Sequence, residues 1–121
     1  MNILRIDSSA QTETAQSRRL TDRFIEGLRK NGRAPVITTR DLDTPLPQIN
    51  RAWIAANTTP DEKRTDADHA TLALSDTLIG EIEAADTLII GVPVYNFAVP
   101  ACLKLWIDLV CRARKTFAYS E

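Results

Sequence analysis

A chain of 121 residues, 44% of them hydrophobic, is long enough to bury the core of one domain, and no composition shift indicates a second. The 15 basic and 16 acidic residues leave a net charge of −1, which argues against a protein that binds nucleic acid through a basic surface. No apolar run approaches the roughly 20 residues that span a bilayer, and the N-terminus lacks the pattern of a signal peptide. The sequence therefore predicts a cytoplasmic protein without membrane contact.

The first part of the chain predicts a strand, a helix and a second strand. Residues 2–7 form a short, partly alternating apolar run that is typical of a strand. After a polar loop, Ser17 is the expected N-cap of a helix over residues 18–31, and Gly32 fits the position just past its end. Residues 36–41 are rich in β-branched side chains and predict the second strand. The apolar face of the helix comprises Leu20, Phe24, Ile25 and Leu28.

The second part predicts a long helix and a third strand. Thr59 is the expected N-cap of a helix that continues to about Ala85, with Pro60 as its first residue and Glu62 as partner in a capping box. The apolar segment 87–92 then predicts a buried strand. The buried face of the helix comprises Leu72, Leu78, Ile79 and Ile82.

A last helix opens at Pro100, so strands and helices alternate along the chain. This order indicates an α/β fold with a doubly wound parallel sheet and right-handed crossovers. In such sheets ligands bind beyond the carboxyl ends of the strands, where the strand order reverses. We therefore expect the loop after the first strand, 8–17, and the loop after the third, 92–100, to border one crevice.

The loop after the first strand has the character of a phosphate site. It contains no glycine, which excludes the glycine-rich dinucleotide fingerprint and the P-loop. It places Ser9 and Ser17 at a helix start, where free amides and the helix dipole favour an anion. Neutral donors without a lysine suit a terminal phosphate such as that of FMN. An ordinary polar turn followed by an N-cap is the other interpretation.

The loop after the third strand is unusually apolar for a surface turn. Val94, Tyr95 and Phe97 are too hydrophobic for a solvated loop, and Asn96 adds an amide among them. Such a loop can lie along a flavin ring, with apolar groups against the face and amides at the polar edge. Packing of these aromatic side chains into the core is the alternative.

Other chemistry has little support in the sequence. Cys102 and Cys111 fall on one predicted helix, where a rise of about 1.5 Å per residue separates them by roughly 13 Å, too far for a disulfide. His69 is the single histidine and lies in a charged segment, with no second ligand at the spacing of a metal site.

These segments resemble the FMN-dependent NADH azoreductases, also described as NADH:quinone oxidoreductases. The resemblance extends over residues 1–121 and implies a flavodoxin-like FMN-binding domain, of which this chain would hold the N-terminal, three-stranded β-α-β-α-β-α portion. The matching segments are Asp7-Ser8-Ser9, Ala15-Gln16-Ser17, Pro93-Val94-Tyr95-Asn96-Phe97, Leu103-Lys104-Leu105-Trp106-Ile107-Asp108 and the tail 112–121.

The resemblance implies cofactor contacts at particular residues. The FMN phosphate would be held by Ser9, Ala15, Gln16 and Ser17. The isoalloxazine ring would be bordered by Val94, Tyr95, Asn96 and Phe97. Ala15 stands where the family often has serine and would act through its backbone, and Val94 stands where the family often has methionine.

The resemblance further implies a two-step reaction, in which NADH reduces FMN by hydride transfer and a quinone or azo compound then takes the electrons at the same place. Because the cofactor carries this chemistry, no catalytic side chain is expected. Family members are homodimers, so a homodimer is implied here as well.

Family members continue beyond the position of Glu121 with further strands. We therefore expect the third strand, which is apolar on both faces, to lie at the sheet edge, and the free chain to be poorly stable and to bind FMN weakly or not at all. A truncated, non-catalytic flavin-binding remnant is an alternative function. A hydrolase of phosphodiesters or phosphopantetheine groups, using the serine loop, is another.

Overall fold

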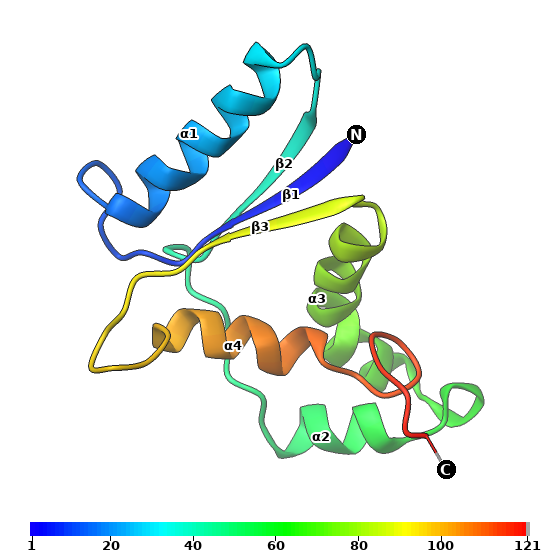
Figure 1. Ribbon diagram of the computed structural model, residues 1–121. Helices are drawn as coiled ribbons and strands as arrows, with labels where there is room; N and C mark the ends of the chain where they lie inside the picture. The colour runs from blue at the N-terminus through cyan, green and yellow to red at the C-terminus, as the bar shows by residue number, and fades with distance from the viewer. Residues whose placement is uncertain (121) are drawn as a thin grey trace.

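A parallel sheet of three strands forms the centre of the molecule in the computed structural model, which describes residues 1–120 (Figure 1). The central strand β1 (Asn2–Asp7) lies between β2 (Val36–Asp41) and β3 (Thr87–Gly91). In register, Ile3 pairs with Ile37 on one side and with Thr87 on the other. The predicted parallel α/β fold is therefore confirmed, and so is the expected position of the third strand at the edge.

The helices divide unequally between the two faces of the sheet (Figure 1). Helix α1 (Gln16–Lys30) lies alone on one face. The other face carries α2 (Arg51–Thr58), α3 (Asp66–Glu83) and α4 (Ala101–Val110). No helix in the described part of the chain is long and apolar enough to cross a membrane.

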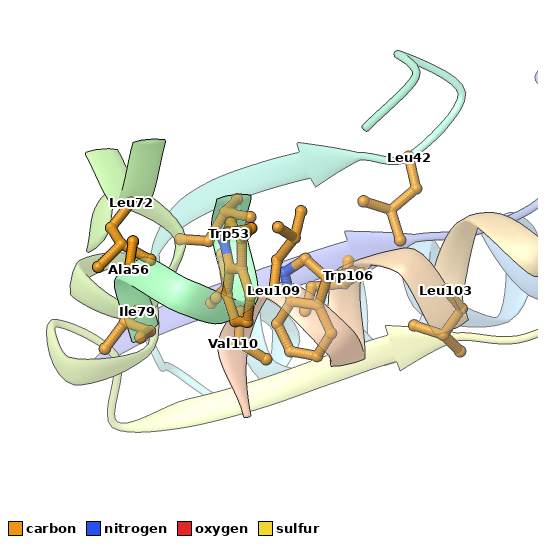
Figure 2. Packing of buried hydrophobic residues seen from close by; sticks show 12 residues of the cluster. Leu42, Trp53, Ala56, Leu72, Ile79, Leu103, Trp106, Leu109 and Val110 are labelled. Carbon is orange, nitrogen blue, oxygen red and sulfur yellow. The ribbon is translucent and has the colours of Figure 1, made fainter. Parts of the chain in front are cut away.

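The main core lies between the sheet and the three helices of the second face (Figure 2). Leu4 and Ile6 of β1 face it, and both tryptophans, Trp53 and Trp106, pack within it. Burial of each large apolar side chain contributes about 1.5–3 kcal/mol, so this cluster fixes how α2, α3 and α4 sit on the sheet. Its remaining members are Leu42, Ala56, Leu72, Leu78, Ile79, Leu103, Leu109 and Val110.

The face that carries α1 is less completely covered. Ile25 is buried against the sheet, but Leu20 and Phe24 of the same predicted apolar face are 64% and 54% exposed. At the neighbouring sheet edge, Leu88 and Ile90 of β3 are also exposed. The apolar face predicted for this helix is thus present but partly exposed. The prediction of a buried strand at 87–92 is wrong for Leu88 and Ile90, because β3 is an edge strand of the sheet. The low stability expected of the free chain stays a prediction.

Helix α1 starts earlier than the sequence predicts. Its N-cap is Ala15, in an extended conformation, so Ser17 lies inside the first turn and the prediction that it caps the helix is wrong. At the C-terminal end, Gly32 lies just past the helix as predicted, and its φ of +76° is one that glycine adopts without strain.

The helix predicted from Thr59 to about Ala85 begins only at Asp66, as α3, and a 3₁₀ turn at Asp61–Lys63 separates it from α2. Thr59 is the C-cap of α2, and the capping box belongs to Thr65 and Asp68 instead. Thr65 and Asp68 repeat the Thr59–Glu62 spacing, and only the second pair forms a box. The side chain of Arg64 donates to backbone carbonyls at the end of α2, which holds the chain in a turn between the two helices.

Arg112, which follows α4, ties the helices of the second face together. It is only 2% exposed. Its guanidinium donates to Asn57 Oδ1 at 3.1 Å, to Ser75 Oγ at 3.2 Å and to Asp76 Oδ1 at 2.5 Å. One side chain thus connects the end of α2, the middle of α3 and the segment beyond α4.

We expect Arg112→Met to lower the free energy of unfolding by about 2–3 kcal/mol, because it removes these charged hydrogen bonds while keeping an unbranched apolar stem. Urea denaturation followed by circular dichroism measures the change. Lys115→Met, at an exposed position, is the control and should change stability by no more than about 0.5 kcal/mol. Equal midpoints for the two variants would contradict the role given to Arg112.

Candidate functional site

The loops after β1 and β3 lie side by side at the carboxyl ends of the strands (Figure 1). Ser8 joins them, because its backbone N–H and its hydroxyl both donate to the carbonyl of Gly91, at 3.2 and 2.7 Å. The thiol of Cys102, at the start of α4, donates to the carbonyl of Ser8 at 3.3 Å, and burial raises the pKa of this thiol. Both loops line one pocket, which confirms the prediction that they border a single crevice.

This pocket has a volume of about 710 Å³ and opens between α1, the loop after β1 and the end of β3. Its size is typical of a small-molecule site. Among residues 1–120, none of the side chains that line it is a lysine, arginine, histidine or carboxylate. The lining residues are Ser9, Gln11, residues 15–17, Leu20, Thr21, Phe24 and residues 89–95.

Most of the residues predicted from the sequence meet at this pocket. Those that line it are Ser9, Ala15, Gln16, Ser17, Val94 and Tyr95. Asn96 and Phe97 do not line it, because they lie in the turn beyond Tyr95, where Phe97 is fully exposed.

The N-terminus of α1 forms one wall of the pocket. Its N-cap, Ala15, offers no side-chain hydrogen bond, so the first-turn N–H groups of the helix have no side-chain cap. Ser17 adds a hydroxyl oxygen that is buried and without a hydrogen-bond partner among residues 1–120. A buried hydroxyl of this kind and an uncapped helix end are both suited to an anionic acceptor.

Tyr95 connects the second loop to the first. Its hydroxyl accepts a hydrogen bond from the backbone N–H of Ala10 at 3.1 Å and lies 3.4 Å from Ser9 Oγ. Ser9 Oγ in turn accepts from the N–H of Gln11 at 3.1 Å. The hydroxyl of Tyr95 therefore lies at the polar side of the pocket, where it meets the Ala10 N–H and the Ser9 hydroxyl of the first loop.

The turn after Tyr95 is backbone-strained. Tyr95 and Ala98 exchange two backbone hydrogen bonds, of 2.9 and 3.1 Å, across Asn96 and Phe97, whose φ angles are +50° and +64°. Asparagine tolerates this region, whereas a phenylalanine there costs about 1–2 kcal/mol. Strain of this kind is concentrated at functional sites, and here it turns an aromatic ring outward beside the pocket.

A network of charged side chains lies behind the first loop, outside the pocket. Arg18 makes two hydrogen bonds to Asp41, of 2.7 and 2.8 Å, and they lower the pKa of that carboxyl and raise the pKa of the guanidinium. Asp7 Oδ2 accepts from Arg5 Nε at 2.7 Å and lies 3.5 Å from Arg18 Nη1. Asp7 Oδ1 is buried and has no hydrogen-bond partner within residues 1–120.

Gly91 is a site residue that sequence analysis missed. A Cβ at this position would stand 3.1 Å from Thr21 Oγ1 and 3.4 Å from both Asp7 Oδ1 and the carbonyl of Ser17. The missing side chain is thus what allows α1 to approach the end of β3. A glycine inside an apolar strand marks such a close approach, and this signal was available in the sequence.

The comparisons with known proteins agree with this architecture. A family model described as "Flavodoxin-like fold" matches residues 1–121. The FMN-dependent NADH:quinone oxidoreductase 1 of Jannaschia sp. (strain CCS1) is 50% identical over 120 residues, which cover 99% of this chain and 60% of that protein. The protein of the same name from Hahella chejuensis is 49% identical over 119 residues, 98% of this chain and 58% of the relative. The chain therefore spans about 60% of the length of these curated relatives.

Solved structures share the fold at lower sequence identity. The azoreductase AzrA superposes with a TM-score of 0.86 at 24% identity, over 99% of this chain and 60% of that one. An FMN-dependent NADH-azoreductase from Bacillus anthracis str. Ames Ancestor, solved in complex with FMN, gives 0.82 at 21% identity over 99% and 59%. At these identities the likeness establishes the fold alone, and it confirms the predicted flavodoxin-like arrangement.

Gly91→Ala tests the close approach of α1 to β3. We expect it to lower the free energy of unfolding by about 1–3 kcal/mol, because the added methyl group meets backbone and buried polar atoms. Thermal unfolding measures the change. Gly27→Ala, at a helical position with open space around it, is the control and should stabilise by about 0.5–1 kcal/mol. Shifts of the same sign in both variants would show that the packing at Gly91 is not restrictive.

Proposed function

The chain belongs to the flavodoxin-like fold family, and from this premise we propose that it binds FMN and acts as an NADH:quinone oxidoreductase that also reduces azo compounds. The observation that carries the proposal is the uncapped N-terminus of α1 with the buried, unpartnered hydroxyl of Ser17 in an uncharged pocket. The curated relatives at 49–50% identity, named for FMN and NADH:quinone chemistry, support it independently. On this proposal residues 1–121 belong to one FMN-binding domain.

The residues of the first loop and α1 fit a phosphate group. The backbone of Ala15, with Gln16 and Ser17, supplies N–H groups at the positive end of the helix dipole, and Ser9 supplies a second hydroxyl. All of these donors are neutral, so the site stabilises a dianion through oriented dipoles rather than through a free cation. These four residues would hold the FMN phosphate.

The second loop fits the flavin ring. Val94 and Tyr95 line the pocket, and Asn96 and Phe97 follow directly in the strained turn. These four residues would border the isoalloxazine, with apolar surface toward the ring and amide groups toward its polar edge. The groups of this loop bind and orient a ring and exclude water from it.

The bound flavin would supply the redox chemistry, by accepting a hydride from NADH and passing electrons to a quinone or azo compound. The chain's own residues would therefore position the two reactants in turn at one place, which is the two-step mechanism. In the part of the chain that the structure describes, the pocket lining contains no carboxylate, histidine or lysine that could act as the general base of a phosphodiester hydrolase, so that alternative has less support.

The proposal extends to assembly and location. Val94, Phe97 and Tyr119 present exposed apolar surface, which a second copy of the chain could cover in a homodimer. An exposed free thiol at Cys111 and the use of NADH both suit the reducing cytoplasm. Sedimentation of the purified protein tests the dimer.

Titration with FMN and with riboflavin, followed by quenching of flavin fluorescence, tests the phosphate site. We expect FMN to bind at least about tenfold more tightly than riboflavin, because only FMN carries the group that the α1 terminus recognises. Oxidation of NADH by the FMN-loaded protein in the presence of a quinone then distinguishes an enzyme from a non-catalytic flavin-binding protein. Equal affinity for the two flavins would contradict the site.

Ser17→Ala should weaken FMN binding by about tenfold, since it removes one hydrogen bond to a charged group, and it should leave riboflavin binding unchanged. Thr71→Ala, which removes an exposed hydroxyl from α3, is the matched control and should change neither affinity. If Ser17→Ala left the FMN affinity at the level of the unmodified chain, Ser17 would have no part in binding the phosphate.

A further inference from the structure

Arg18 has a buried side chain that the proposed function does not use. It lies in the first turn of α1 but is only 8% exposed and does not line the pocket. Its Nε donates to the carbonyl of Gln11 at 3.1 Å, and its Nη2 donates to the carbonyl of Ser9 at 3.0 Å. The same guanidinium also makes its two hydrogen bonds to Asp41. The guanidinium of Arg18 thus binds two carbonyls of the first loop, on the side away from the pocket, and links them to Asp41 of β2.

The partner of Arg18 is itself fixed. Asp41 is the last residue of β2 and pairs in register with Asp7 of β1. Its Oδ1 also accepts from the backbone N–H of Asp43 at 3.0 Å. The guanidinium is therefore anchored at the carboxyl ends of two strands, and the loop carbonyls that it binds are anchored with it.

These contacts set which side of the loop faces the pocket. In a trans peptide the C=O and the next N–H point in opposite directions. Because the carbonyl of Ser9 points back to Arg18, the N–H of Ala10 points the other way, and it donates to the hydroxyl of Tyr95 in the pocket wall. The carbonyl of Gln11, also held by Arg18, likewise directs the N–H of Thr12 away from the guanidinium.

We propose that Arg18 is a positioning residue for anion binding, which holds the carbonyls of Ser9 and Gln11 behind the loop so that donors alone face the bound phosphate. This inference rests on the proposed function, because it requires the loop to hold a phosphate. Without the guanidinium the carbonyl dipoles are free to turn toward the pocket, and the carboxylates of Asp41 and Asp7 lose a neutralising charge. Both changes repel a phosphate, although Arg18 never touches it.

Two substitutions separate this role from simple attraction by positive charge. Arg18→Lys keeps the charge but loses the planar fork that reaches two carbonyls and a carboxylate together. Arg18→Gln loses the charge as well. If Arg18 acts by positioning, both variants should weaken FMN binding by roughly tenfold or more and leave riboflavin binding within about twofold, so that the preference for FMN is lost.

Arg40→Lys is the matched control. Arg40 precedes Asp41 in β2 and also makes a forked ion pair, but its partner is Glu81 of α3, away from the loop. This variant should lose comparable ion-pair stability while keeping the ratio of FMN to riboflavin affinity. A loss of that ratio in Arg40→Lys would show that general destabilisation, not loop positioning, controls phosphate binding.

Hydrogen exchange of the flavin-free protein gives a readout that needs no ligand. We expect Arg18→Lys to speed amide exchange in residues 8–17 and to leave exchange in the strands unchanged. Uniformly faster exchange over the whole chain would overturn the proposal in favour of a purely structural role.

The failure of this inference is distinguishable from that of the proposed function. If the unmodified chain binds FMN no better than riboflavin, or binds neither, the proposed phosphate site is wrong and the role of Arg18 falls with it. If the unmodified chain prefers FMN and Arg18→Lys keeps that preference, the site stands and only the positioning role is overturned.

Discussion

The carboxyl end of β1 is the point on which the rest of the structure depends. There Ser8, the residue after β1, donates twice to the carbonyl of Gly91, the last residue of β3. Gly91 has no side chain, so α1 can pack against this junction, and the first turn of the helix reaches the pocket. These contacts hold the two loops together, so that both of them line the same pocket.

The elements that the sequence predicted well are those with a local signature. Apolar and β-branched runs located all three strands, and the parallel order then placed two particular loops together. One error arose where equivalent local signals competed. The spacing of Thr59 and Glu62 recurs at Thr65 and Asp68, and only packing at the end of α2 decides which pair caps a helix.

The rest of the site could not be predicted because its partners are distant in sequence. Arg18 and Asp41 are far apart along the chain, as are Ser8 and Gly91, and no periodicity marks either pair. The exposure of Leu20 and Phe24 has the same origin. A helix face can be recognised as apolar from its spacing, but whether anything covers it depends on neighbours that the helix sequence does not encode.

The distribution of charge explains how a neutral pocket can recognise an anion. The buried ion pairs near the first loop lie behind it, where Arg18 is matched by Asp41 and Asp7 is matched by Arg5. The desolvation of these ions is offset by their mutual hydrogen bonds, and none of them faces the pocket. At the start of α1 the pocket wall presents helix N–H groups and the hydroxyl of Ser17, while Arg18 binds the carbonyls of Ser9 and Gln11 behind the loop. Such a wall favours a phosphate at the helix end and still leaves the adjoining apolar surface free of charge, as an uncharged aromatic ring requires.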